Sequence, residues 1–107
     1  FGVDAETLAL LPDDAALINA GRGSLIDETA LLARLDAGLL RFALLDVFAE
    51  EPLPDNHPLW GHPRAILTPH VAADTVPEEA AAQIAANMRA LAAGTPVTGL
   101  IDRQRGY

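Results

Sequence analysis

The fold is decided by the stretch Ile18–Asp27, which reads INAGRGSLID and places an arginine between two glycines directly after an apolar run. Residues 16–18 are all apolar, which is typical of a parallel strand covered on both faces, and a first strand is predicted at about 15–20. Gly21 and Gly23 allow a tight turn and a close approach of the backbone to a ligand. Asp27 is expected to cap a following helix. Strand, turn and helix in this order predict an open α/β sheet with a site at the carboxyl ends of its strands.

The alternation of predicted strands and helices continues towards the C-terminus. The helix that follows Asp27 is expected to end at Gly38, and residues 42–47 form a second apolar strand. Four prolines make residues 49–64 a loop, and a third strand is predicted at 65–68. Because a strand, a crossover helix and a strand form a βαβ unit, the strands are predicted to be parallel.

Two further helices are predicted near the ends of the chain. Asp4 is expected to cap a short helix that Pro12 ends. A long helix is expected to begin at 75–77 and to end at Gly94, and the tail 97–107 is expected to dock against another part of the protein. The apolar stripe of the long helix consists of Ala81, Ile84, Ala85, Met88, Leu91 and Ala92.

Composition narrows the classes of function. The formal net charge of -8 argues against nucleic acid and anionic membranes as partners, because both favour a basic surface. The chain has no cysteine, and no apolar run approaches the roughly 20 residues of a membrane span. We therefore expect a soluble cytoplasmic protein. Because the chain begins at Phe1, close to a helix, and a lone helix would leave a sheet edge uncovered, we expect a fragment of a longer protein.

Ionisable side chains follow each of the three predicted strands: Arg22, the pair Glu50-Glu51, and His70. Parallel strands bring these positions to one edge of the sheet, where they can share a cleft. An arginine binds a carboxylate bidentately, and a histidine can give or take one proton near neutral pH. A carboxylate beside the histidine favours the imidazolium. The set suits protonation of a carbonyl oxygen, with hydride delivered by a nicotinamide cofactor.

Each of these residues also has a plainer interpretation. Arg22 could be solvated or salt-bridged, His70 could simply end its strand, and the acid pair could form an ordinary turn. Asp46 is different, because a carboxylate that ends an apolar strand is costly to bury unless a ligand amide or a backbone donor binds it. The histidines at 57, 62 and 70 lack the spacing of a metal site.

Several segments, in this order, resemble the D-isomer-specific 2-hydroxyacid dehydrogenases. They are INAGRG at 18–23 with IDE at 26–28, LDVFxxEPLP at 45–54, HPLW at 57–60 and LTPHVAA at 67–73. The resemblance covers essentially the whole chain. The ending 101–107, together with HVAA, resembles most the glyoxylate/hydroxypyruvate reductase A branch of that family.

The resemblance implies the second half of a Rossmann-type doubly wound parallel sheet, followed by a long helix and a tail. Residues 1–76 would be the C-terminal half of an NAD(P)-binding domain, and residues 77–107 would return to the substrate domain. The glycine-rich phosphate loop and most of the substrate domain would lie upstream, so the fragment alone is not expected to be active. The full-length protein would be a homodimer.

The resemblance also implies roles for single residues. Arg22 would bind the carboxylate and carbonyl of a small 2-oxo acid, His70 would be the general acid, and Glu51 would pair with His70. Asp46 would hold the carboxamide of the nicotinamide. The residues in contact with the cofactor would be Ala20, Gly21, Arg22, Asp46, His70, Ala72 and Ala73.

The implied reaction is hydride transfer from NAD(P)H to glyoxylate or hydroxypyruvate, which gives glycolate or glycerate. NADP is the expected cofactor, with NAD as the alternative. One rival interpretation is a non-catalytic, NAD(P)-sensing protein similar to the corepressors that share this fold. Another is a truncated remnant with only a structural use. The presence of Arg22, Glu51 and His70 together favours the enzyme.

Overall fold

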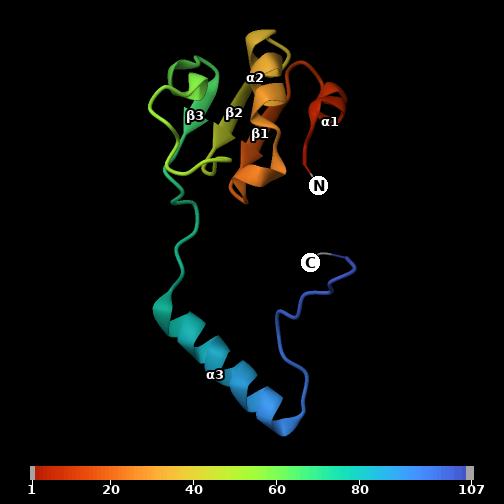
Figure 1. Cartoon of the computed structure of the whole chain (residues 1–107), viewed down its shortest axis with the longest axis vertical. Helices are drawn as coiled ribbons and strands as arrows, with labels where there is room; N and C mark the ends of the chain where they lie inside the picture. The colour runs from red at the N-terminus through yellow and green to blue at the C-terminus, as the bar shows by residue number, and fades with distance from the viewer. Residues whose placement is uncertain (1, 106–107) are drawn as a thin grey trace. The chain divides into compact units, whose positions relative to one another are not determined.

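The computed structural model describes residues 2–105, which form one compact unit up to Ala73 and a second from Asp74 on. The first unit is built on a sheet of three parallel strands in the order β1-β2-β3. Figure 1 shows the three arrows side by side and pointing the same way. The predicted α/β fold with parallel strands is confirmed, although each strand is slightly shorter than its predicted range. The strands are β1 (Ala16–Asn19), β2 (Phe42–Leu45) and β3 (Ala65–Leu67).

The helices of the first unit begin where the sequence predicts. Helix α1 (Ala5–Ala9) begins after Asp4 and helix α2 (Glu28–Asp36) after Asp27, and each cap carboxylate accepts a hydrogen bond from a backbone N–H of the first turn. Gly38 follows α2 with a φ of 71°, the left-handed conformation that glycine adopts most easily. Two short 3-10 helices, η1 (Gly23–Leu25) and η2 (Pro58–Gly61), lie in the connecting loops.

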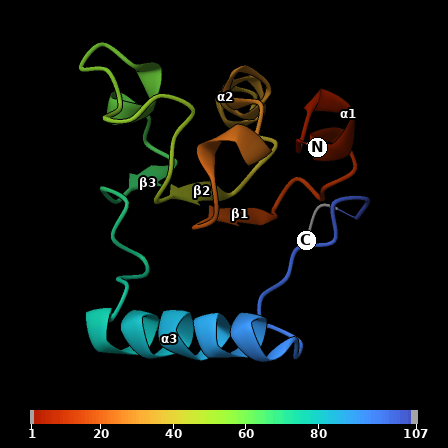
Figure 2. The ribbon, with the colours of Figure 1, turned by 60° about the horizontal axis from the view of Figure 1, so that its bottom comes forward.

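The core of the first unit lies on one face of the sheet. Helices α1 and α2 are on the same side of the strands, as Figure 2 shows. Helix α2 is the crossover between β1 and β2, and its leucines pack on the buried side chains of β2. Among residues 2–105, the hydrophobic side chains that are at most 2% exposed are Leu8, Leu31, Leu35, Leu40, Ala43, Leu45, Val47 and Leu59.

The opposite face of the sheet is open within this unit, so the coverage of the strands on both faces stays a prediction. Ile18 of β1 is 67% exposed and Ile66 of β3 is 49% exposed. These two residues lie opposite Leu44 of β2 in the register of the sheet, so they share its uncovered face. The apolar run of β1 is typical of a doubly covered strand, but both helices of the unit lie on the other side.

The second unit contains helix α3 (Pro77–Ala93), which ends before Gly94 as predicted. No residue of α3 is buried, and Ile84, Met88 and Leu91 of its apolar stripe are each at least 60% exposed. The side chain of Asn87 donates to the carbonyl of Thr98 and accepts from its N–H. These two hydrogen bonds hold the start of the tail against helix α3. The expected docking of the tail stays a prediction, and its residues 106–107 lie outside the described range. Within residues 2–105, no helix is both long and apolar enough to cross a membrane.

Candidate active site

The turn after β1 is held in shape by the side chain of Asn19. Its Oδ1 accepts a hydrogen bond from the N–H of Gly21 at 3.1 Å, and its Nδ2 donates to the carbonyl of Arg22 at 3.0 Å. Asn19 is buried, so both bonds are shielded from water. Our sequence reasoning gave Asn19 no role. The signal that could have found it is the Asn-x-Gly spacing, which is typical of a side chain that closes an Asx turn.

Arg22 lies at the tip of this turn and is exposed, with Nη1 donating to the carbonyl of Gly21 at 2.8 Å. Gly23 is buried against the backbone of Phe48 and Ala49, and a Cβ at this position would lie 1.9 Å from the carbonyl carbon of Phe48. The sequence predicted a close approach of this backbone to a ligand. At Gly23 the structure shows a close approach to the chain's own backbone, and the contact with a ligand stays a prediction.

Glu51 and His70 meet at the edge of the sheet. His70 Nδ1 lies 2.7 Å from Glu51 Oε2, and Glu51 Oε1 accepts the N–H of Phe48 at 3.0 Å. The neighbouring Glu50 is exposed. The geometry therefore distinguishes the two acids of the pair. Glu51 is the one that touches the histidine.

The environment of Glu51 favours its ionised form. The hydrogen bond from Phe48, followed by that to His70, lowers the pKa of Glu51 below its ordinary value. The charges of His70 and Arg22 lower the pKa of this carboxyl further, while desolvation acts in the opposite direction. Arg22 is thus close enough to Glu51 for its charge to act on the same carboxylate that holds His70.

The backbone of His70 has an uncommon conformation. Its φ is 54°, in the left-handed region that residues with a side chain seldom adopt. The N–H of His70 donates to the carbonyl of Thr68 at 3.1 Å, which closes a tight turn directly after β3. Local strain of this kind persists where the surrounding structure fixes it, and it gathers at functional sites. Here the turn directs the imidazole to Glu51.

Asp46 is 1% exposed and binds donors of its own chain. Oδ1 accepts from the hydroxyl of Thr68 and from the N–H of Val71 at 3.0 Å, and Oδ2 accepts from the N–H of Ala72 at 3.0 Å. These hydrogen bonds lower the pKa of Asp46 below its ordinary value, and the bond from Thr68 has the largest effect. Of the two partners that the sequence left open, a ligand amide or a backbone donor, the structure contains the backbone donors. The nicotinamide contact of Asp46 stays a prediction.

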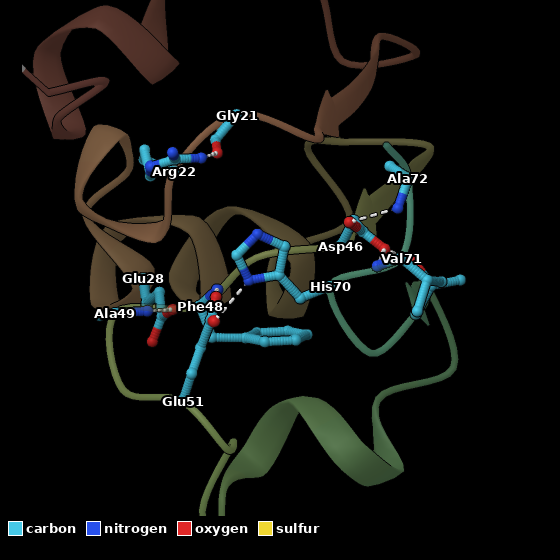
Figure 3. A network of polar contacts seen from close by, with 11 residues as sticks. Gly21, Arg22, Glu28, Asp46, Phe48, Ala49, Glu51, His70, Val71 and Ala72 are labelled. Atoms are coloured by element: carbon cyan, nitrogen blue, oxygen red, sulfur yellow. Dashed lines mark hydrogen bonds and ion pairs between the residues drawn. The ribbon is translucent and has the colours of Figure 1, made fainter. Parts of the chain in front are cut away.

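Figure 3 shows Arg22, Glu51 and His70 together beyond the strand ends, with Asp46 beneath the segment that carries Ala72. The parallel direction of the strands brings these residues to one edge from distant positions in the sequence. A mainly apolar hollow of about 510 Å³ adjoins the Glu51–His70 pair. The residues lining it include Phe48, Leu53, Trp60 and Leu67.

Each of the other two histidines has a carboxylate partner other than Glu51. His57 Nε2 is 3.4 Å from Glu28, and His62 Nε2 is 3.1 Å from Asp36. Among residues 2–105, no three histidine, cysteine or acidic side chains are grouped in a way that could hold a metal ion. The three histidines therefore form separate pairs in the described chain.

A parallel sheet that brings an arginine and an acid-paired histidine to its carboxyl edge is typical of a nucleotide-binding α/β domain with an acid–base site. Residues 2–72 match the family model described as D-isomer specific 2-hydroxyacid dehydrogenase, NAD binding domain. The chain belongs to this family, and the fold predicted from the resemblance is confirmed.

The chain is also similar to particular members of the family. It is 50% identical over 105 residues to glyoxylate/hydroxypyruvate reductase A of Salmonella newport, covering 98% of the chain and 34% of that protein. A D-isomer specific 2-hydroxyacid dehydrogenase from Xanthobacter autotrophicus Py2, solved with NADPH and MES, is 48% identical with a TM-score of 0.90, over 96% of this chain and 43% of that one.

A third relative is the NADPH-dependent glyoxylate/hydroxypyruvate reductase of Sinorhizobium meliloti, solved with NADP and sulfate. It is 33% identical with a TM-score of 0.86, and the match covers 97% of this chain and 34% of that one. The chain thus spans about a third of the length of the curated relatives it matches.

Proposed function

We propose that this chain is the C-terminal part of an NAD(P)H-dependent reductase of small 2-oxo acids. In this proposal the full-length protein transfers hydride to glyoxylate or hydroxypyruvate and forms glycolate or glycerate. The observation that supports it most is the Glu51–His70 pair, at 2.7 Å, beside an exposed Arg22. The names of the relatives favour these two substrates. As the family resemblance implies, we further propose that the protein is a cytoplasmic homodimer.

The proposed roles follow from the geometry of the three side chains. The Arg22 guanidinium is free on its exposed side to bind a carboxylate bidentately. Glu51 occupies Nδ1 of His70, which leaves Nε2 for the carbonyl oxygen of the substrate. His70 then gives its Nε2 proton to that oxygen as the carbonyl carbon receives hydride. Glu51 stabilises the ring in the orientation that this transfer requires.

The residues assigned to the cofactor fit a nicotinamide at this edge. Ala20, Gly21, Ala72 and Ala73 are all exposed, so they are accessible to a nicotinamide ring. Asp46 fixes the backbone at Ala72 through a hydrogen bond, which holds that wall in place. NADPH supplies the hydride when bound. We propose NADP over NAD because solved relatives contain NADPH or NADP.

Domain organisation is part of the same proposal. Residues 1–76 would complete a nucleotide-binding domain whose phosphate loop lies upstream, and residues 77–107 would return to the substrate domain. The match of the family model to residues 2–72 supports the first part. The uncovered apolar face of the sheet is consistent with a unit that packs against further protein.

The function is tested by NADPH oxidation with the full-length protein on glyoxylate, hydroxypyruvate, pyruvate and phenylpyruvate. We expect turnover of the first two, and we expect Arg22→Ala and His70→Ala each to lower kcat/KM by about 10²- to 10⁴-fold. Near-normal turnover in both variants would overturn the proposal. NADPH binding without turnover in the unmodified protein would favour the corepressor-like alternative.

A further inference from the structure

Glu28 lies outside the proposed catalytic set, yet it contacts the segment that carries Glu51. It is the first residue of α2, where an acid is already favourable to the helix dipole. Its side chain also makes two contacts outside the helix. Oε1 accepts the N–H of Ala49 at 2.7 Å, and Oε2 lies 3.4 Å from Nε2 of His57. The side chains of Glu28 and His57 are only 16% and 20% exposed, so the pair is largely shielded.

The orientation of the His57 ring supports this contact. Its Nδ1 accepts the N–H of Leu59 at 3.3 Å, at the start of η2. A neutral imidazole has one N–H, so when Nδ1 accepts, the proton is on Nε2. That nitrogen is the one that faces Glu28.

Glu28 thereby anchors the turn formed by residues 48–51, which belongs to no helix or strand. Two consecutive amides of this turn bind carboxylates: Phe48 N–H binds Glu51 and Ala49 N–H binds Glu28. The same backbone rests on Gly23, directly after Arg22. The peptide between Phe48 and Ala49 is thus both bound by Glu28 and packed against Gly23.

We infer that Glu28, supported by His57, is a positioning residue for the reaction: it holds the 48–51 turn where Glu51 reaches the imidazole of His70. A displacement of the turn moves the Glu51 carboxylate away from Nδ1, and the present 2.7 Å contact leaves little tolerance. The kinetic part of this inference rests on the proposed function.

The test compares three variants of the full-length protein. Glu28→Ala removes both contacts, and we expect kcat to fall about 10-fold, with KM and the Kd of NADPH unchanged within about twofold. Glu28→Gln keeps an oxygen that accepts from Ala49, so most of the kcat should return. His57→Asn keeps an acceptor for Leu59 but no longer reaches Glu28, and we expect a loss of about threefold. Glu6→Ala, an exposed acid in the first turn of α1, is the matched control.

A double-mutant cycle separates positioning from general stability. If Glu28 acts through Glu51, Glu28→Ala should cause no further loss of kcat in the Glu51→Gln background. An equal fractional loss in both backgrounds, or an unchanged kcat in Glu28→Ala, would overturn the inference. If Glu28→Ala does not fold, the same cycle is run with His57→Asn.

A spectroscopic readout separates this inference from the proposed function. The ring ¹⁵N shifts of His70 should change in Glu28→Ala and be restored in Glu28→Gln, whether or not the protein turns over a 2-oxo acid. Absence of turnover in the unmodified protein would reject the proposed function alone. Unchanged His70 shifts in Glu28→Ala would reject the positioning role alone.

Discussion

Three neighbouring carboxylates at the strand ends differ in what they bind. Asp46 binds the backbone of the next loop, Glu51 binds an imidazole, and Glu50 faces solvent. The position of Asp46 at the end of an apolar run was enough to predict that it is bound. The pattern of residues could not separate Glu50 from Glu51, because their difference depends on a contact with His70, 19 residues away. The family motif singled out Glu51, and the geometry agrees.

The two acids of the pair should differ in kinetics. Glu51→Gln removes the charge beside His70, and we expect kcat/KM of the full-length protein to fall by about 10- to 100-fold. Glu50→Gln makes the same chemical change at the adjacent exposed position and should stay within about twofold. Steady-state NADPH oxidation measures both. Equal effects of the two substitutions would contradict the assignment of Glu51.

The depressed pKa of Glu51 predicts how stability depends on pH. Phe48, His70 and Arg22 all favour the ionised carboxylate, so its folded-state pKa lies below the ordinary value of 4.5. Its contribution is therefore fully present well above pH 4.5 and is lost as the pH falls through the folded-state pKa.

Urea unfolding of the full-length protein measures the contribution of Glu51 to stability. The measurement runs from neutral pH down to the lowest pH at which the protein still folds. The free energy of unfolding should fall more steeply on acidification in the unmodified protein than in Glu51→Gln. Asp46 acts in the same direction in both proteins, so the comparison isolates Glu51. Parallel curves would mean that folding leaves the pKa of Glu51 unchanged.

At the scale of the elements, local signals were sufficient for the helices and insufficient for the turns. Asp4 and Asp27 cap helices through bonds within four residues, and Gly38 needs only its own backbone freedom, so all three could be predicted. The turn at 48–51 is held by Glu28, more than 20 positions away, which no local pattern reveals. The sequence indicated that the backbone at Gly23 makes a close approach, but it did not reveal that the partner is the 48–51 turn.

Gly23 packs closely against the 48–51 turn, so adding one methyl group at residue 23 should lower the stability of the protein. In Gly23→Ala the new Cβ would overlap the backbone of Phe48, which cannot move aside as a flexible side chain can. We expect the free energy of unfolding to fall by about 1–3 kcal/mol. Gly61→Ala is the control, because a Cβ there meets nothing within 4 Å, and it should change stability by less than about 0.5 kcal/mol. Chemical unfolding of both variants tests this, and equal stabilities would contradict the close packing.

For the molecule as a whole, the parallel direction of the strands could be predicted and the covering of the sheet could not. Continuous apolar strands and a crossover helix predict parallel pairing. Which face is covered depends on where the helices pack, and within the first unit only one face is covered. The exposed isoleucines Ile18 and Ile66 mark the other face.

Cofactor binding should stabilise the whole protein. A ligand that binds only the folded state adds about 2.7 kcal/mol when its concentration is 100 times its Kd. Thermal unfolding of the full-length protein with and without NADPH should therefore show a clear rise in Tm that increases with cofactor concentration. A remnant with only a structural use would show no rise, and that result would contradict the proposed cofactor.

The central claim is that Arg22, Glu51 and His70 act on one small 2-oxo acid beside a nicotinamide. Its most direct test is a crystal structure of the full-length protein with NADP and oxamate, a substrate analogue that is not reduced. The account predicts the Arg22 guanidinium on the oxamate carboxylate and His70 Nε2 within about 3.2 Å of its amide oxygen, with Glu51 on Nδ1. Oxamate bound with Arg22 or His70 directed away from it would contradict the account.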